Sequence, residues 1–337
     1  MNKINKRVLI YTMTDGLGDY FVIGDLIRTA AIKIPNTECI VVHRGNKHVH
    51  LWPYGNSSDR FFSIYSLTQL VSLVLLLHRK RKNGAKVFAF QMAPGSVQGF
   101  LFFALLRKFG LIDFIVDFNL INADIITPPV GGKYILHLHL DQLAQLFDCP
   151  KLDTTPRLEL PLRQWHGGCE TKGPPLFGIH PWTRRSSLNL KWPDSNWLEI
   201  VDYLITCGGI PVLFGKDVKF GEFGKVLIDR YGADKVCIKP SASVEDLVKT
   251  VASLSLLISL NSSVIHVAYA CKVRTVVLSG PHLSIWTPID VLFREVRDPG
   301  ALFPPSDERK SHEVIAMVSR IATSDVKLAI DNLLNRP

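Results

Sequence analysis

The sequence predicts an α/β protein with two successive domains, each built on a mainly parallel sheet. The chain has 337 residues, of which 47% are hydrophobic and 20% are charged, so it can bury two sizeable cores. Apolar runs of strand length alternate with helical patterns in two series along the chain. A stretch rich in glycine and proline separates the two series, as in an interdomain linker.

The first series opens with a strand, a glycine-containing turn, a helix and a second strand, which is the unit of a doubly wound sheet. Asp19 lies at the mouth of this first helix. It is either an acid that satisfies free N–H groups of the helix or a catalytic carboxylate. Strands are expected at 7–12, 39–43, 86–90 and 114–118, and helices at 20–34 and 98–109.

His137, His139 and Asp141 are spaced two residues apart, which would place them on one face of a strand as a metal cluster. Residues 140–147 have a helical pattern, however, and a helix would splay these side chains. We therefore expect a surface or acceptor-site role without metal.

The second series follows the linker expected at 164–168 and 172–175. Strands are expected at 176–180, 210–214, 236–238 and 274–279, and helices at 197–207, 221–231 and 324–334, with a further helix that opens at the capping residue Ser243.

The stretch 254–270 is the most informative part of the second series. Its first seven residues form a nearly unbroken apolar run, typical of a strand buried on both faces. The run breaks at Asn261, Ser262 and Ser263, and a packed helix follows. Ligands of open α/β sheets bind beyond the carboxyl ends of the strands, where helix N–H groups favour negative charge. A phosphate-bearing ligand is therefore expected here, although the same residues could simply cap the helix.

The net charge of +9 is concentrated in the first half, where residues 1–165 hold 19 Lys and Arg against 12 Asp and Glu. The sharpest basic cluster, 78–82, directly follows the apolar run 71–77. This juxtaposition is compatible with contact with an anionic membrane surface, but a buried helix with a solvated basic tip is favoured. Nucleic-acid binding is not expected, because the sequence lacks interleaved aromatic residues and a helix-turn-helix pattern.

A cytoplasmic protein is expected from three further observations, and a peripheral position on the inner membrane face is left open. Residues 8–11 are too short an apolar run for a signal peptide. The longest apolar runs, 71–77 and 100–106, fall well short of a membrane span. The cysteines have no paired metal-ligand or redox spacing, which suits reduced thiols.

Several short motifs, taken in their order and spacing, resemble the lipopolysaccharide heptosyltransferase family (glycosyltransferase family 9). The resemblance runs from the first strand to Pro288. The motifs are Gly18-Asp19, His180-Pro181, Lys191-Trp192-Pro193 with Trp197, residues 209–215, residues 243–247, Asn261-Ser262-Ser263 with His266, and Gly280-Pro281.

The resemblance implies a GT-B fold, in which two Rossmann-like domains have parallel sheets that face across a cleft. Residues 1–165 would bind the acceptor, 176–320 the nucleotide sugar, and 321–337 would form a C-terminal helix. The implied reaction is inverting, metal-independent transfer of heptose from an ADP-sugar to a lipopolysaccharide or other cell-surface acceptor, glycan or lipid-linked, without a cofactor. Independently, the sequence has no Asp-X-Asp triplet that would hold a metal on a diphosphate.

The site residues are also implied by the resemblance. Asp19 matches the base that takes the acceptor proton, and the Gly18 loop lies on the acceptor side. Arg184 and Lys191 can offset the charge of the leaving diphosphate. The other expected donor-binding residues are Trp182, Thr183, Ala242, Asn261, Ser262, Ser263 and His266.

Two features depart from the family, and the first is the donor loop 184–190, which is longer than usual and places Lys191 directly beside Trp192. Second, members usually have Asp-Ser/Thr-Gly where this chain has Asn261-Ser262-Ser263, so a negative charge is lost and sugar recognition is expected to differ. This departure supports an alternative, a non-catalytic protein that binds a nucleotide or glycan. A nucleotide-sugar epimerase is a second alternative, but its carboxylate and histidine set is not identifiable here.

Overall fold

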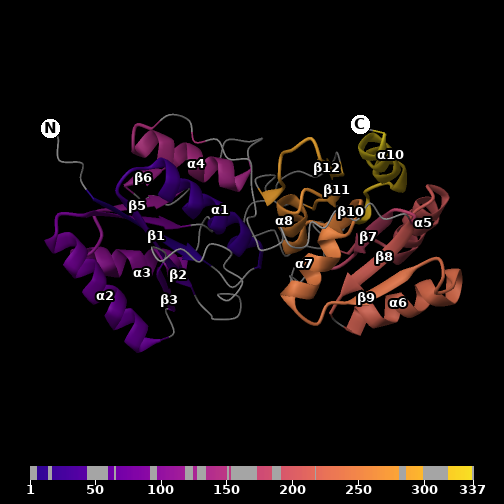
Figure 1. Cartoon of the computed structure of the whole chain (residues 1–337), viewed down its shortest axis with the longest axis horizontal. Coiled ribbons are helices and arrows are strands. Elements are labelled where there is room, and N and C mark those ends of the chain that lie inside the picture. The colour runs from indigo at the N-terminus through magenta and orange to yellow at the C-terminus, as the bar shows by residue number, and fades with distance from the viewer. Residues whose placement is uncertain are drawn as a thin grey trace. The chain divides into compact units, whose positions relative to one another are not determined.

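The computed structural model describes residues 6–13, 17–43, 60–63, 66–91, 97–117, 124–126, 134–149, 152, 173–183, 191–216, 218–280, 286–298 and 318–335. The chain divides into two compact units, Met1–Leu160 and Pro161–Pro337 (Figure 1). Most of the expected linker lies outside the described residues. Each unit is described by itself.

The first unit contains a six-stranded sheet in the order β3-β2-β1-β4-β5-β6, and its described strand pairs are parallel. Val8, Leu9, Ile10 and Tyr11 of the central strand are all buried, as expected where helices cover both faces of a sheet. The strands are β1 (Arg7–Met13), β2 (Thr37–His43), β3 (Arg60–Ser63), β4 (Lys86–Gln91), β5 (Phe114–Asp117) and β6 (Ile125–Ile126).

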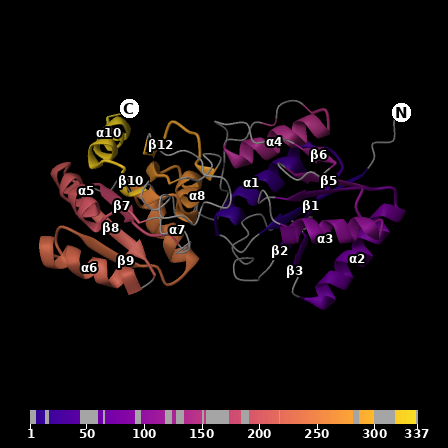
Figure 2. The same ribbon diagram turned by 180° about the vertical axis from the view of Figure 1, so that it is seen from behind.

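Helices lie on both faces of this sheet (Figures 1 and 2). On one face, α2 (Leu67–Lys82) and α3 (Val97–Lys108) contribute side chains to a common core cluster. On the other face, α1 (Leu17–Lys33) packs against α4 (Ile135–Leu146).

Helix α2 corrects the expectation of a buried helix at 71–77. Leu73, Leu76 and Leu77 are buried against the sheet, whereas Val71 and Leu75 are exposed. Ser66 caps the helix by accepting a hydrogen bond from the Gln69 N–H. Within the described ranges, no helix combines the length and the apolar character needed to cross a bilayer.

Helix α4 begins earlier than the sequence indicated and contains His137, His139 and Asp141. Successive helical residues are rotated by about 100°, so residues two apart point in different directions. The surface role expected for His139 is wrong, because this side chain is buried and donates to Gln142 Oε1 at 3.1 Å. Burial lowers its pKa to about 3, so it is neutral at neutral pH. Among the described residues, no group of three or more His, Cys, Asp or Glu is placed to hold a metal ion.

The second unit contains a six-stranded sheet in the order β12-β11-β10-β7-β8-β9, and its described pairs are also parallel. All five residues of β10 are buried, as its apolar run predicts. The strands are β7 (Leu176–His180), β8 (Ile210–Gly215), β9 (Cys237–Pro240), β10 (Leu256–Leu260), β11 (Arg274–Leu278) and β12 (Phe293–Val296).

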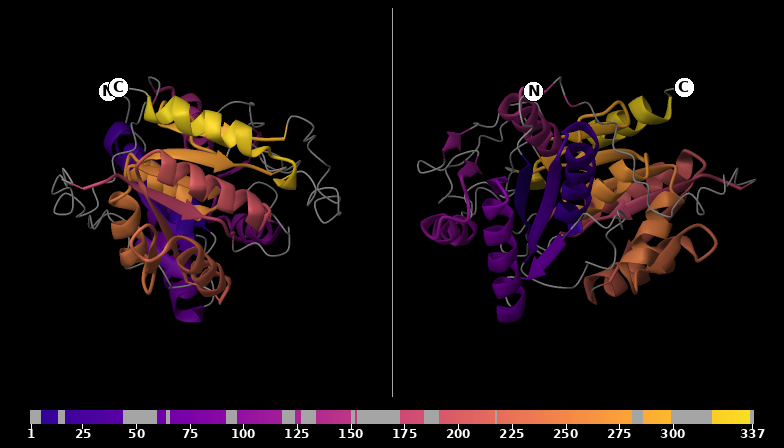
Figure 3. Two further views of the ribbon diagram at one scale, coloured as in Figure 1. Left: turned by 90° about the vertical axis from the view of Figure 1, so that its right-hand side faces the viewer. Right: turned by 60° about the vertical axis from the view of Figure 1, so that its left-hand side comes forward.

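The helices of the second unit lie in two groups. α5 (Asp194–Thr206), α6 (Val218–Tyr231) and α10 (Thr323–Leu334) share one core cluster with the sheet, and Figure 3 shows α5 beside α10. α7 (Val244–Ala252) packs against α8 (Ser263–Ala270).

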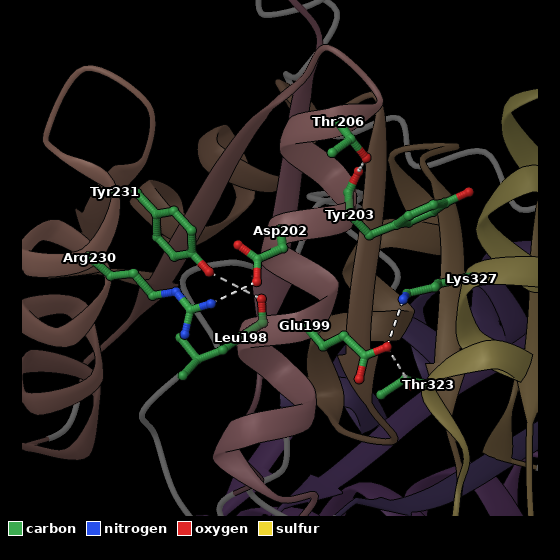
Figure 4. A network of polar contacts seen from close by, with 9 residues as sticks. All are labelled: Leu198, Glu199, Asp202, Tyr203, Thr206, Arg230, Tyr231, Thr323 and Lys327. Atoms are coloured by element: carbon green, nitrogen blue, oxygen red, sulfur yellow. Dashed lines mark hydrogen bonds and ion pairs between the residues drawn. The ribbon is translucent and has the colours of Figure 1, made fainter.

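Polar contacts hold α5 between its two neighbours (Figure 4). Glu199 Oε1 accepts from Lys327 Nζ at 2.6 Å and from Thr323 Oγ1 at 2.8 Å, and these hydrogen bonds lower the pKa of Glu199. On the α6 side, Arg230 donates to Asp202 at 2.9 Å. Exposed pairs of this kind contribute little stability, because water and salt screen them. They fix the register between helices whose packing is apolar.

Candidate functional site

The candidate site lies at the carboxyl edge of the second sheet, where β7 and β10 are neighbours. From β7 the chain proceeds through β8 to β9 on one side, whereas β10, β11 and β12 extend on the other. Such a reversal of strand order is the place where open α/β sheets bind ligands. His180 ends β7 opposite Ser259 of β10, with Ser259 Oγ 3.5 Å from His180 Nδ1.

Trp182 and Thr183 leave the sheet at this point, directly after β7. Trp182 is half-buried, and its ring meets Phe220 and Phe223 of α6 edge-on, with centroids 6.4 and 6.0 Å apart. These contacts hold the indole beside the end of β7. Arg184 lies outside the described residues.

Lys191 is exposed and pairs with Asp194 across 3.2 Å. Both side chains are largely exposed, so the pair is weak and Lys191 can exchange Asp194 for a phosphate. Its neighbour Trp192 is fully buried and donates its indole N–H to the Ile321 carbonyl at 2.9 Å. Trp192 therefore fixes the backbone from which Lys191 projects.

The N-terminus of α8 is open to an anion. Its N-cap residue, Ser262, makes no side-chain cap bond, and the first turn holds no acidic residue. The Ser262 hydroxyl oxygen is buried and has no hydrogen-bond partner among the described residues. Free N–H groups and the helix dipole favour negative charge at such an end.

Helix α7 provides a contrast on the same edge of the sheet. Ser243 and Asp246 form a reciprocal capping box at its N-terminus, and Glu245 adds another negative charge. This end repels anions. Ala242 is exposed just before the cap, and the Ser241 N–H donates to the Gly215 carbonyl at 2.8 Å. Ala242 thus lies after β9, two strand spacings or about 10 Å from β7.

Asn261 belongs to a hydrogen-bonded network that no local pattern in the sequence indicates. Its side-chain amide donates to Ser279 Oγ at 3.3 Å and to Thr287 Oγ1 at 3.0 Å. Thr287 donates to Glu295 Oε1 at 2.7 Å, and Arg297 donates to the same oxygen at 2.7 Å. Since Thr287 has a single hydroxyl hydrogen, which Glu295 accepts, Thr287 can only accept from position 261. An amide meets this requirement and a carboxylate does not.

Asn261→Asp is therefore expected to lower the free energy of unfolding by about 1–3 kcal/mol, because two donated hydrogen bonds are lost and a second carboxylate joins Glu295. Adding Glu295→Gln should restore most of this loss, since a Gln amide can donate to Thr287 and free its hydroxyl to donate to the new carboxylate at position 261. Denaturant unfolding of both single variants and the double variant measures the coupling. Equal stability of Asn261→Asp and the unmodified protein would show that Thr287 does not depend on a donor at position 261.

His266 is buried on α8, and burial lowers its pKa to about 4. At neutral pH it is uncharged, so it can hydrogen-bond a ligand but cannot supply positive charge. The positive potential at this edge must come from the α8 N-terminus and from basic side chains.

In the first unit, Gly18 and Asp19 lie in the first turn of α1, directly after β1. The order of the first sheet also reverses beside this strand, between β1 and β4. Gly18 and Asp19 therefore follow β1 in the first sheet as Trp182 and Thr183 follow β7 in the second. The side chain of Asp19 lies outside what the structure describes.

Comparisons with known proteins give a family and a fold. A sequence model of glycosyltransferase family 9 (heptosyltransferase) matches residues 126–295, which is 170 of the 337 residues. No curated protein sequence matches.

Three solved structures are similar over nearly the whole chain. A family 9 glycosyl transferase from Veillonella parvula has a TM-score of 0.67 at 15% identity, covering 98% of each chain. The E. coli ADP-heptose lps heptosyltransferase II has a TM-score of 0.61 at 18% identity, covering 97% of this chain and 98% of its own. The iron-containing dodecameric glycosyltransferase TibC from enterotoxigenic E. coli has a TM-score of 0.60 at 13% identity, covering 98% and 76%.

These likenesses, together with the two parallel sheets and their flanking helices, show the GT-B class of fold that the family resemblance implied. The family match covers half of the chain and includes β7, β10 and α8, together with Asn261, Thr287 and Glu295. The chain is therefore a glycosyltransferase and belongs to glycosyltransferase family 9, the heptosyltransferase family.

Proposed function

We propose that this protein is an inverting, metal-independent transferase that moves heptose from ADP-heptose onto a lipopolysaccharide or other cell-surface glycan acceptor. The observation that carries the proposal is the uncapped, acid-free N-terminus of α8 beside the β7–β10 switch point. A diphosphate fits this position because its charge meets free N–H groups there. An ADP-heptose donor is supported by the likeness to the E. coli enzyme that is described as an ADP-heptose heptosyltransferase.

The second unit would bind the donor. Ser262, Ser263 and the first turn of α8 would hold the diphosphate, with Lys191 and Arg184 supplying positive charge. The Asn261 Oδ1 atom remains available to a sugar hydroxyl, because the described bonds of this amide use its nitrogen. The nucleotide would extend along the sheet edge past Trp182 and Thr183 toward Ala242. His266 of α8, which is neutral, would form a hydrogen bond with the donor.

The first unit would bind the acceptor near Gly18, which lies in the first turn of α1 rather than in the loop expected from the sequence, with Asp19 as the base. The acceptor hydroxyl attacks the anomeric carbon on the face opposite the diphosphate while Asp19 takes its proton. The bond between the anomeric carbon and the phosphate oxygen breaks, and the configuration inverts. The nucleoside diphosphate leaves with the bonding electrons, and the α8 N-terminus stabilises its added negative charge.

Turnover is expected to be unaffected by a strong chelator, because helix N–H groups and basic side chains would perform the role of a metal. The measurement compares initial rates before and after exhaustive treatment with EDTA, with metal analysis of the treated protein. The comparison matters because a structurally similar glycosyltransferase is iron-containing. Activity lost on chelation and regained with one metal would overturn the metal-independent mechanism.

The donor is tested by thermal unfolding in the presence of ADP, UDP, GDP and CDP and of ADP-heptose. At a ligand concentration 100 times Kd, binding to the folded state stabilises it by about 2.7 kcal/mol. This corresponds to a rise in Tm of roughly 5–10 °C for a unit of this size. We expect the largest rise with ADP-heptose, followed by ADP. A larger rise with another nucleotide would reassign the donor, and no rise with any of them would remove the proposal.

A non-catalytic binding protein is the second candidate, and Asn261 in place of a carboxylate favours it. Such a protein would show the ADP-heptose shift without turnover. If ADP-heptose raises the Tm and sugar transfer is observed that depends on Asp19, the non-catalytic alternative is excluded.

A further inference from the structure

The outer surfaces of α2 and α3 carry exposed apolar side chains that take no part in the core of the first unit. Both helices already fill that core with their inner faces, through Leu73, Leu76 and Leu77 of α2 and Phe103 and Leu106 of α3. The two helices cover the same face of the sheet (Figures 1 and 2). Their outer faces have no packing partner in the described part of the chain.

An apolar row runs along the outside of each helix. Leu67, Val71 and Leu75 are four residues apart on α2, and Leu67 and Leu75 are 76% and 64% exposed. Leu101 and Leu105 of α3 continue in the same spacing to Phe109, which is 69% exposed. Residues four apart lie above one another on a helix, so each set forms a continuous stripe. We call these two stripes the apolar rows.

Basic side chains lie at the C-terminal end of both apolar rows. In α2, Lys80 pairs with Glu38, and Arg81 pairs with Asp113 across 2.5 Å. Arg79 and Lys82 are exposed and form no ion pair among the described residues. Lys108 is exposed in the same way at the end of α3. Neither helix contains an Asp or Glu residue.

The helix dipole accounts for cations at a helix C-terminus, but it does not account for exposed leucine and phenylalanine. The two features together are those of a helix that lies in a membrane interface, with apolar residues on one side and Lys or Arg beside them. An anionic surface attracts each such cation.

A second copy of the chain fits this surface less well than a membrane does. In a two-fold symmetric dimer the same patch meets itself, so Arg79, Lys82 and Lys108 of one copy would approach those of the other. The cores of protein interfaces are also depleted of lysine. Charge complementarity therefore favours an anionic lipid surface.

We propose that the outer face of α2 and α3 is a docking surface for anionic phospholipid membranes. The apolar rows enter the boundary between headgroups and acyl chains, and Arg79, Lys82 and Lys108 bind lipid phosphates. The inference does not depend on which sugar is transferred, because it concerns a surface that contains none of the residues assigned to the donor or the acceptor.

The test is co-sedimentation of the full chain with vesicles of phosphatidylcholine alone or with phosphatidylglycerol added, at low and high salt. We expect binding to the anionic vesicles at low salt and little binding to the neutral ones. Arg79→Gln with Lys82→Gln should weaken this binding roughly 10- to 30-fold. Val71→Ser with Leu75→Ser should weaken it about tenfold or more, since less apolar area is buried.

Matched control variants remove two positive charges, or two exposed apolar side chains, from the second unit. Lys225→Gln with Lys235→Gln deletes two exposed lysines, and Val226→Ser with Leu328→Ser deletes two exposed apolar side chains. Both controls should bind as the unmodified protein does, and thermal unfolding should show that all four variants are folded. Equal loss in the controls, or no loss in the α2 variants, would overturn the proposal. A dimer in solution that Val71→Ser with Leu75→Ser dissociates, without any vesicle binding, would assign the surface to a second copy instead.

Discussion

Replacing Asp19 by asparagine is expected to reduce the rate of sugar transfer by about 10²- to 10⁴-fold, which is the usual contribution of a general base. Asparagine has nearly the same shape and can still accept hydrogen bonds, but it cannot take the acceptor proton. Nucleotide binding should persist, because the residues proposed to bind the donor belong to the second unit. The measurements are initial rates with ADP-heptose and a lipopolysaccharide acceptor, together with the ADP-induced rise in Tm.

A purely structural role of Asp19 would give a different result. Asp19 lies in the first turn of α1, where a carboxylate stabilises the helix by about 0.3–1 kcal/mol through the dipole. Asparagine is itself a good residue near a helix N-terminus, so Asp19→Asn should change Tm very little. A variant with a lower Tm and a nearly unchanged rate would assign Asp19 to the helix rather than to the reaction.

Replacing Trp192 by alanine is expected to lower the free energy of unfolding of the second unit by about 3–5 kcal/mol. The indole is fully buried and packs edge-on against Trp197, with ring centroids 5.0 Å apart. Its removal leaves a large cavity and deprives the Ile321 carbonyl of a donor. Denaturant unfolding followed by fluorescence and by circular dichroism measures the loss and tests whether the two units unfold separately.

A pair of phenylalanine variants isolates the hydrogen bond. The indole nitrogen of Trp197 has no hydrogen-bond partner among the described residues, so Trp197→Phe removes ring volume without breaking such a bond. Trp192→Phe removes the same atoms and the bond to Ile321. We expect Trp192→Phe to be the more destabilising by about 1–3 kcal/mol, and to weaken nucleotide binding because the backbone at Lys191 is released. Equal losses in the two variants would show that the bond contributes nothing.

The central elements of both sheets could be predicted from the sequence because parallel strands that are buried on both faces have nearly continuous apolar runs. Strand β7 was expected at 176–180 and found at Leu176–His180. The edge strands β3 and β12 were not expected. They have only four residues each, and the arginine and glutamate of β12 hide its apolar positions.

The candidate site was predictable only where it follows a recognisable strand. Asn261 and Ser262 could be proposed as site residues because they interrupt the apolar run of β10. Thr287 and Glu295 were missed, since their role depends on contacts between segments 26 or more residues from Asn261 that no local pattern encodes. A charged residue at the carboxyl end of a strand is the signal that could have pointed to Glu295.

The exposure of side chains on α2 also could not be read from the sequence. The run 71–77 is uniformly apolar apart from one serine, so periodicity does not distinguish its inner residues from its outer ones. Only the packing against β3 and β4 shows that Leu73, Leu76 and Leu77 face the sheet.

The bond from Trp192 to Ile321 joins residues 129 positions apart, and the contacts of Glu199 with α10 have a similar span. During synthesis, the first unit can fold before the second has been made, because its elements are contiguous in sequence. The second unit starts with β7 and α5 but cannot close its core before α10 has been made. The nascent chain would therefore fold one unit at a time, and the second unit would be the last to reach its native structure.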